Sequence, residues 1–359
     1  MSKQFTRVRI TDIAKRARVS SGTVDRVIHN RGEVSPKTRD RVLAIIKEMN
    51  YEPDILASTL ASKKTYHFAS LIPEASSDSE FWAIPALGLK KALDQVHHFG
   101  ITHDTFTFNY FNRESFKHAA NELLAIKPDG VIIAPVFADL AEVIISKCIK
   151  DNIPVVLINA NMFNLDKLSF VGQDSFRSGM VSARLLNYGL KPNHQIFIVN
   201  IMSEKGTNTH LLSREEGFRC YFRDIPAMRQ KLHTINISGN DLQKVYEVLS
   251  GTLVTNNKHA SGGGIFVTNS RVYLVAGFLK SMHIKDFRLL GYDLLTTNIS
   301  HLQEGTIDFL ISQKPFEQGF KSFMSLFDHL VMKKNVPTYQ YLPIDIITRE
   351  NIDYYVTHL

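Results

Sequence analysis

The chain has 359 residues, of which 44% are hydrophobic and 21% charged, a balance that allows a sizeable core and more than one domain. Its two cysteines, Cys148 and Cys220, lack CxxC spacing, which argues against a disulfide framework or a zinc module and fits a reducing compartment. No apolar run resembles a signal peptide or reaches the ~18 residues of a membrane span, so we expect a soluble, cytoplasmic protein with no membrane partner.

The excess positive charge lies at the N-terminus. Residues 1–64 contain 14 Lys and Arg against 7 Asp and Glu, which accounts for the whole net charge of +7. A small basic module on a neutral larger domain indicates a polyanionic partner for the module alone. A solvated basic tail would lack the apolar periodicity that these residues show.

Three short helices are predicted in this module. Thr11 is a typical N-cap for the first, Ser20 for the second, which runs from Ser21 to about His29, and Ser35 for the third, with Pro36 at its first position. Each helix has an apolar stripe on one face. A tight turn between the first two helices is typical of a helix-turn-helix, whose second helix enters the major groove of DNA.

The polar face of the second helix carries the candidate DNA contacts. It presents Ser21, Gly22, Asp25, Arg26 and His29, opposite the apolar stripe. For Asp25 three roles remain open. Its carboxylate can accept from cytosine, it can orient Arg18 or Arg26, or it can be a solvated surface group.

Residues 8–60 resemble the DNA-binding head of the lactose-repressor/galactose-repressor family of bacterial transcription regulators. The segments "ITDIAKRARVS", "TVDRV", "VSPKTRDRV" and "NYEPDILASTL" carry the resemblance without a gap. It implies that Ser21, Gly22 and Arg26 read bases. It also implies contacts near phosphates for Thr11, Ser20, Thr23 and His29. The family usually has Ser at Asp25 and a bulkier residue at Gly22, so the preferred DNA sequence is expected to differ.

Residues 53–65 are predicted to form a hinge between a head at 1–52 and an effector-binding and dimerisation domain at 66–359. A two-turn helix over "DILASTLA" is marginal alone and should order on a partner or on DNA. In the resembling family this helix pairs across a dimer and wedges a leucine into the minor groove. Leu60 matches that leucine, although it can also be a helix-capping apolar contact.

From Tyr66 onward, apolar strand-like runs alternate with helical stretches, so we expect parallel sheets covered by helices. The predicted fold class is therefore a helical head followed by a two-lobed α/β domain, with a ligand at the carboxyl ends of the strands. We assign lobe one to 66–173 plus 314–338 and lobe two to 174–313 plus 339–359.

No phosphate-binding loop, nucleophile elbow or metal-ligand spacing is present, so neither an enzyme nor a cofactor is predicted. Candidate ligand contacts follow the strands instead: Phe81, Trp82, Asp139, Asn159, Asp174, Arg214, Asn269, Asp293 and Gln313. This pattern resembles the type I periplasmic-binding-protein fold, in which aromatic rings hold sugar faces and polar groups take the hydroxyls. Arg214, Asn269, Asp293 and Gln313 match residues of ribose-type binders especially well.

Structural roles remain open for several of these residues. Trp82 can belong to the core, Phe81 can anchor its loop, and Asp174 can hold the crossover between lobes. Asp139 and Asn159 are equally compatible with structural roles, and Asp293 and Gln313 can be structural at the crossovers.

Together these features predict a homodimeric regulator that binds a pseudo-palindromic double-stranded operator and responds to a small effector, a sugar or sugar derivative. The C-terminal segment lacks a heptad pattern, which favours a dimer over a tetramer. The alternative is a sugar sensor or solute-binding protein without functional DNA binding.

Overall fold

The computed structural model describes residues 8–28, 31–32, 34–49, 51, 64–76, 80–191, 194–202, 209–225, 231–239, 241–254 and 262–356. The chain divides into two compact units, Met1–Lys63 and Lys64–Leu359. Each unit is described by itself.

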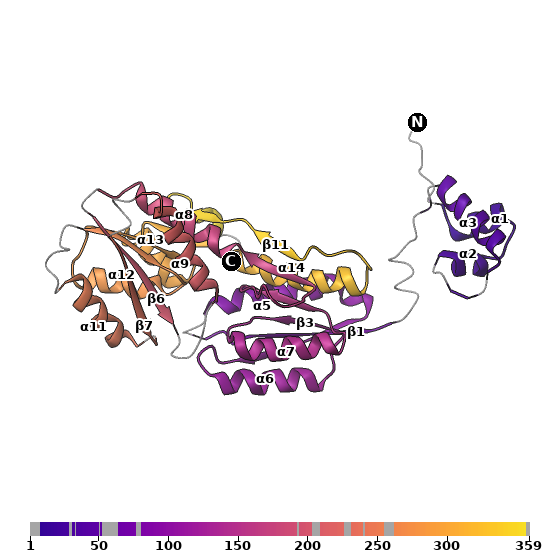
Figure 1. Ribbon diagram of the computed structural model, residues 1–359, viewed down its shortest axis with the longest axis horizontal. Coiled ribbons are helices and arrows are strands. Elements are labelled where there is room, and N and C mark those ends of the chain that lie inside the picture. The colour runs from indigo at the N-terminus through magenta and orange to yellow at the C-terminus, as the bar shows by residue number, and fades with distance from the viewer. Residues whose placement is uncertain are drawn as a thin grey trace. The chain divides into compact units, whose positions relative to one another are not determined.

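The first unit is a three-helix module: α1 (Ile10–Ala17), α2 (Ser21–Ile28) and α3 (Pro36–Glu48) (Figure 1). Its core is built from the predicted apolar faces, with these side chains buried: Ile13, Ala14, Ala17, Val24, Val27 and Val42. Arg18 takes a left-handed conformation at the end of α1 and makes the tight turn into α2. The helix-turn-helix prediction is thus confirmed in its helices and its core.

Two of the three predicted N-cap residues, Ser20 and Ser35, are confirmed. The Ser20 hydroxyl accepts from the amide of Thr23 at 3.1 Å, and the Ser35 hydroxyl accepts from the amide of Thr38 at 3.4 Å. The prediction for Thr11 was wrong, because α1 begins one residue before it. There the Asp12 carboxylate accepts from the amide of Arg9 at 2.9 Å and fixes the first turn.

The second unit contains two six-stranded sheets, one per lobe. The first sheet is wholly parallel, in the order β11 (Tyr339–Leu342), β5 (Ser169–Gln173), β4 (Val155–Ile158), β3 (Gly130–Ile133), β1 (Tyr66–Pro73) and β2 (Ile101–Phe108). The second has the order β12 (Asp345–Ile347), β10 (Phe309–Ser312), β9 (Phe287–Tyr292), β8 (Gly263–Val267), β6 (Gln195–Met202) and β7 (Leu232–Ser238). Among the strands in the described residues, only β12 is antiparallel to its neighbour.

Helices cover both faces of each sheet (Figure 1). Lobe one uses α5 (Ala83–Val96), α6 (Arg113–Ala125), α7 (Ala138–Lys150) and α14 (Pro315–Leu330). Lobe two uses α8 (Ser175–Asn187), α9 (Thr209–Phe222), α11 (Leu242–Leu253), α12 (Val272–Ser281) and α13 (Thr296–Gln303), with the short α15 (Asp353–Val356) near the C-terminus. Alternate residues of β6 enter the two cores: Ile196 and Ile198 face α8 and α9, while Val199 and Ile201 face α11 and α12. Because both faces are covered, the inner strands β3, β4 and β8 are continuously apolar and buried.

The chain crosses between lobes three times, and the last crossing differs from the predicted boundary. We expected residues from 339 onward in lobe two, but β11 pairs in parallel with β5 of lobe one. The crossing therefore falls between Leu342 and Asp345, where β12 begins. The other crossings follow Gln173 and Gln313, at the ends of β5 and β10.

Two glycines allow α8 and α9 to approach closely. A Cβ added at Gly179 would lie 2.0 Å from the carbonyl oxygen of Arg214, and one at Gly217 would lie 1.9 Å from that of Phe176. Both obstacles are backbone atoms, which cannot move away without separating the helices. The position of Arg214 therefore depends on this contact.

We expect Gly179→Ala to destabilise the second unit by about 1–3 kcal/mol, because overpacking forces the two helices apart. Gly251→Ala is the matched control, since nothing lies within 4 Å of the added Cβ at that helical position. Thermal unfolding should show a lower midpoint for the first variant and an unchanged or higher one for the second. Equal midpoints for both variants would contradict the close packing of α8 on α9.

No helix in the described ranges is both long and apolar enough to cross a bilayer.

Candidate functional site

A small cavity between the lobes brings together seven of the nine residues predicted to contact a ligand. They are Phe81, Trp82, Asn159, Arg214, Asn269, Asp293 and Gln313, and we call the space that they line the Asp293 cavity. They come from both lobes and from distant parts of the chain. Parallel strands place them there, because their carboxyl ends meet at one edge of each sheet.

Gln313 is the centre of the polar network in this cavity. Its amide nitrogen donates to Oδ2 of Asp293 at 2.7 Å, and its amide oxygen accepts from Arg214 and, at 3.4 Å, from Asn159. Asn159 follows β4 of lobe one, whereas Gln313 follows β10 of lobe two. The last bond therefore joins the two lobes directly.

Arg214 is held rigidly although it is only 1% exposed. One guanidinium nitrogen donates to the carbonyl oxygen of Thr268 at 2.7 Å, and the guanidinium lies 3.7 Å from the ring centroid of Tyr292. Its Nε atom is buried without a partner among the described residues. Stacking and hydrogen bonding thus orient the guanidinium group, and its Nε–H group remains available to a ligand.

Asp293 combines burial, an unusual backbone and an unsatisfied oxygen. It is 3% exposed, its φ is +69°, and its Oδ1 atom has no hydrogen-bond partner in the described part of the chain. Burial raises the pKa of this carboxyl to about 7, against the lowering effects of the Arg214 charge and the hydrogen bond from Gln313. Buried, strained and poised near neutrality, Asp293 has the properties expected of a ligand-binding group.

Two asparagines shape the rest of the polar lining. Asn159 shares the left-handed backbone, with φ +71°, which short polar side chains tolerate best. Asn269 donates to the carbonyl oxygen of Ile201 at 2.6 Å and accepts from the amide of Arg271 at 3.1 Å. Asn269 is therefore fixed by the backbone at the ends of β6 and β8.

The two aromatic residues lie at the start of α5. Phe81 and Trp82 form the 3-10 turn η1 (Glu80–Trp82), and their rings meet edge to face with centroids 5.2 Å apart. They are 8% and 3% exposed, so each is buried by its neighbours as well as facing the cavity.

The two remaining candidates lie outside the Asp293 cavity. The carboxylate of Asp139 forms an ion pair with Arg113, which lowers the pKa of Asp139 mainly through that hydrogen bond. Asp174 caps α8, where its carboxylate accepts from the amide of Arg177 at 2.9 Å. Both contacts agree with the structural alternative for these residues, although Asp174 also lines the third cavity described below.

Four lining residues were not predicted: Tyr110, His210, Ser270 and Arg271. His210 lies one helical turn before Arg214 on α9, and burial together with the Arg214 charge lowers its pKa to about 3, so its ring is neutral. The Arg271 guanidinium lies 5.4 and 5.0 Å from the rings of Tyr110 and Phe111 across the cleft. The spacing of His210 from Arg214 was a usable signal, whereas nothing in the sequence placed Arg271 opposite Tyr110.

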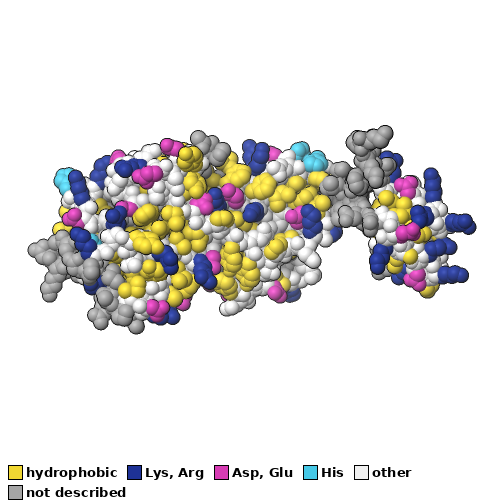
Figure 2. Space-filling model, turned by 90° about the horizontal axis from the view of Figure 1, so that it is seen from above, with side chains coloured by type: hydrophobic (Ala, Val, Ile, Leu, Met, Phe, Trp, Pro, Cys, Tyr) yellow, Lys and Arg dark blue, Asp and Glu magenta, His cyan; other side chains and the backbone are white. Residues whose placement is uncertain are grey.

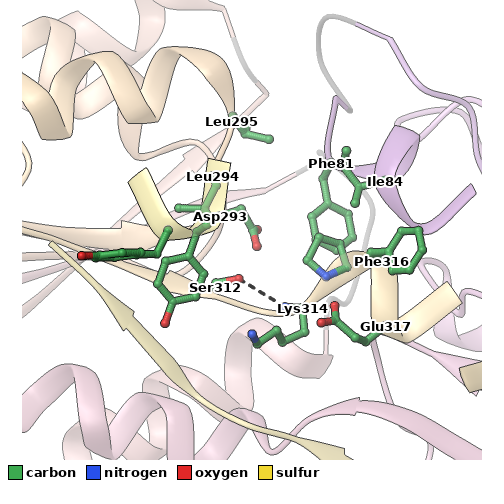
Figure 3. A pocket seen from close by; sticks show the side chains of 12 residues that line it. Phe81, Ile84, Asp293, Leu294, Leu295, Ser312, Lys314, Phe316 and Glu317 are labelled. Atoms are coloured by element: carbon green, nitrogen blue, oxygen red, sulfur yellow. Dashed lines mark hydrogen bonds between the residues drawn. The ribbon is translucent and has the colours of Figure 1, made fainter. Parts of the chain in front are cut away.

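The Asp293 cavity has a volume of about 40 Å³, roughly the share of a single water molecule. A second cavity of about 340 Å³, the apolar cavity, shares Phe81 and Asp293 with the first. Figure 3 shows Phe81, Ile84 and Phe316 facing Asp293, Leu294 and Leu295 across it. A third, of about 630 Å³, shares His210 with the Asp293 cavity. A ligand of ordinary size must therefore part the lobes or extend into a neighbouring cavity.

The exposed face of α2 carries the candidate DNA contacts in the first unit. Ser21, Gly22 and Arg26 are exposed, while Thr23 and Asp25 are half-buried. Lys and Arg side chains spread over the visible face of this module (Figure 2, dark blue). Lys and Arg side chains suit DNA phosphates, and a helix with an exposed polar face suits the major groove. His29 and Leu60 lie outside the described residues, as does the predicted hinge helix.

The fold and these two sites define a class: a helix-turn-helix DNA-binding module joined to a two-lobed ligand-binding domain. The comparisons agree. Residues 9–54 match the bacterial regulatory proteins of the lacI family, and residues 68–334 match the periplasmic binding protein domain. The chain belongs to the lacI family of bacterial transcription regulators.

Individual relatives support this assignment. The chain is 26% identical to the ribose operon repressor of Halalkalibacterium halodurans, over 95% of this chain and 96% of that protein. It is 33% identical to the catabolite control protein A of Staphylococcus xylosus, over 43% of this chain and 44% of that protein. A solved structure described as a LacI transcriptional regulator from Bacteroides fragilis superposes with a TM-score of 0.72 and 32% identity, covering 81% of this chain and all of that one. The glucose-galactose binding protein GanP of Geobacillus stearothermophilus has a TM-score of 0.68 at 22% identity, covers 80% of this chain and 99% of its own, and shows the shared fold.

Proposed function

We propose that the protein is a homodimeric, cytoplasmic repressor whose affinity for a pseudo-palindromic operator is controlled by a sugar bound at Asp293. The observation that carries this proposal is the Asp293–Gln313–Arg214 network beside Phe81 and Trp82. A sugar offers many hydroxyl groups and flat C–H faces. Fixed polar side chains suit the hydroxyls, and aromatic rings suit the faces.

The names of the relatives support the same ligand class. One is named for a ribose operon, and a solved structure that shares this fold is described as a glucose-galactose binding protein. A sugar sensor without DNA binding is disfavoured, since the helix-turn-helix module has a complete core and an exposed polar face on α2. Two heads in a dimer would contact two half-sites about one helical turn apart.

Coupling between the sites follows from the three lobe crossings. A sugar that changes the angle between the lobes alters the spacing of the two heads in a dimer. The coupling is reciprocal, so operator DNA must change sugar affinity by the same factor as sugar changes operator affinity.

The test begins by selecting a preferred DNA sequence from a random library with the full-length protein and screening sugars by thermal shift, because a ligand of the native state raises the melting temperature. We expect a palindromic consensus and a binding constant that falls steeply with salt. A protein that selects no sequence, or whose melting temperature no sugar raises, would refute the proposal.

The pH dependence of sugar binding gives a separate prediction. The pKa of Asp293 is raised to about 7 without a ligand, and sugar hydroxyls that donate to the carboxylate should lower it. Binding at pH 6 should therefore release up to one proton, and affinity should rise from pH 5 to pH 7 and then level off. Calorimetry in two buffers of different ionisation enthalpy measures the release. Asp293→Asn should abolish the proton release. Proton uptake on sugar binding would contradict the assignment of Asp293 as the group that binds sugar.

The same shift affects the ligand-free protein. Because the pKa of Asp293 in the folded protein lies above the ordinary value of 3.8, the protonated carboxyl contributes stability below about pH 4, and this contribution is lost as pH rises through about 7.

A further inference from the structure

The third cavity, which we call the outer cavity, adjoins the Asp293 cavity at His210 and has a volume of about 630 Å³. It is lined by the loop after β4, the end of β5, and the first turns of α8 and α9. The known site does not explain its polar groups. A ligand bound there would lie beside one seated at Asp293, because His210 lines both spaces.

Two amide side chains in the outer cavity have unsatisfied polar atoms. Neither Nδ2 nor Oδ1 of Asn161 has a hydrogen-bond partner among the described residues, although both atoms are buried. Gln173 is 2% exposed, and its nitrogen donates to the carbonyl oxygens of Ser312 and Pro343 while its oxygen has no partner there. Buried polar groups are nearly always paired, so such atoms in a large cavity are available to hydrogen-bond a polar ligand. The ligand must both donate and accept, as hydroxyl groups do.

Aromatic rings continue outward from these amides. Phe163 and Tyr341 line the outer cavity, and Tyr339 stands between their rings. The ring planes of Phe163 and Tyr339 lie within 29° of each other, with centroids 6.4 Å apart, and those of Tyr339 and Tyr341 within 12°, with centroids 5.9 Å apart. The three rings are 68%, 42% and 49% exposed, which is unusual for large apolar side chains. These nearly parallel aromatic rings can pack against the flat faces of sugar rings, and the unsatisfied amides beside them can hydrogen-bond the sugar hydroxyl groups.

The apolar cavity, which shares Phe81 and Asp293 with the Asp293 cavity, fits such a ring less well. Two of its polar groups away from Asp293 are engaged, because Lys314 forms a 2.5 Å ion pair with Asp345 and the Ser312 hydroxyl accepts from the amide of Lys314. Leucine, proline and phenylalanine side chains make up much of the rest (Figure 3). A hydroxylated ring would gain few hydrogen bonds there.

We propose that the outer cavity is a second sugar subsite, so that the effector is an oligosaccharide with one ring at Asp293 and the next at Asn161 and Gln173. This inference rests on the proposed sugar response and specifies its ligand. The rings of Phe163, Tyr339 and Tyr341 then pack against the part of the oligosaccharide that extends beyond the second sugar ring.

Calorimetry on the full-length protein tests the proposal. The probes are glucose, xylose, mannose and galactose, each compared with its own disaccharide and trisaccharide. We expect at least one disaccharide to bind about tenfold or more tightly than its monosaccharide, since a second ring adds several hydrogen bonds. Asn161→Ala should cancel this gain and change monosaccharide affinity by less than about twofold.

Two controls separate binding from folding. Asn187→Ala changes a partly buried asparagine on α8 that donates to Tyr221 at 3.3 Å and lines none of the three cavities, so it should leave every affinity unchanged. Asn161→Ala removes an unsatisfied amide, so the melting temperature without sugar should stay the same or rise. A lower melting temperature would assign Asn161 a structural role and overturn the proposal.

The remaining outcomes distinguish this inference from the proposed function. If a monosaccharide binds as tightly as its oligomers, or if Asn161→Ala keeps the gain, the second subsite is refuted and the sugar-responsive repressor stands. If no sugar of any length binds the wild-type protein, both are refuted.

Discussion

Replacing Asp293 with asparagine should weaken sugar binding by about 10- to 150-fold, because hydrogen bonds to a charged group contribute about 1.5–3 kcal/mol. The change keeps the shape of the side chain and suits the left-handed backbone at this position, where φ is +69°. Loss of affinity would therefore report the missing charge and acceptor rather than a distorted loop. Titration calorimetry with the tightest-binding sugar of the screen measures it.

Asp139→Asn is the matched control for this variant. Asp139 is also an acidic residue near a strand end, but its carboxylate forms an ion pair with Arg113 outside the Asp293 cavity. Sugar affinity should hardly change in the control. If the control loses affinity and Asp293→Asn does not, the site has been placed at the wrong carboxylate. Neither variant should change operator affinity in the absence of sugar.

Replacing Arg26 with alanine should weaken operator binding by about 1–3 kcal/mol per half-site while random DNA loses much less. Arg26 is exposed on α2, on the face opposite the buried Val24 and Val27. An arginine at this place can bond to guanine with two hydrogen bonds, a contact that only the correct base provides. Fluorescence anisotropy with the selected operator and with random DNA measures both losses.

Arg41→Ala, at an exposed position on α3, supplies the comparison. If Arg41 contributes only its charge, removing it should weaken binding to the operator and to random DNA equally and should lower the salt dependence of binding. If Arg26→Ala also reduces both equally, Arg26 contacts phosphates and does not read a base.

The strands of the second unit were predictable where burial on both faces makes them continuously apolar. Apolar runs of this kind became β1, β4 and β9, for example. β11 was missed because it is an edge strand with exposed tyrosines at Tyr339 and Tyr341, so its pattern is not that of a buried strand. The misplaced lobe boundary has the same cause.

Strand ends also predicted much of the candidate site, because fold topology brings them to one edge. Side-chain direction was not predictable in the same way. Asp139 and Asp174 follow strands as Asp293 does, yet one pairs with Arg113 of α6 and the other caps α8. Both outcomes depend on the packing of neighbouring helices. The unsatisfied amide of Asn161 likewise becomes apparent only when its surroundings are known.

The central claim is that sugar binding at Asp293 controls operator affinity. The most direct measurement is the operator dissociation constant of the full-length protein, with and without a saturating amount of the sugar that raises its melting temperature most. We predict a change of about 5- to 150-fold, matched by an equal change in sugar affinity when operator is present. In Asp293→Asn the change in operator affinity should require about 10- to 150-fold more sugar. An operator dissociation constant that stays the same while the sugar is bound would contradict the account.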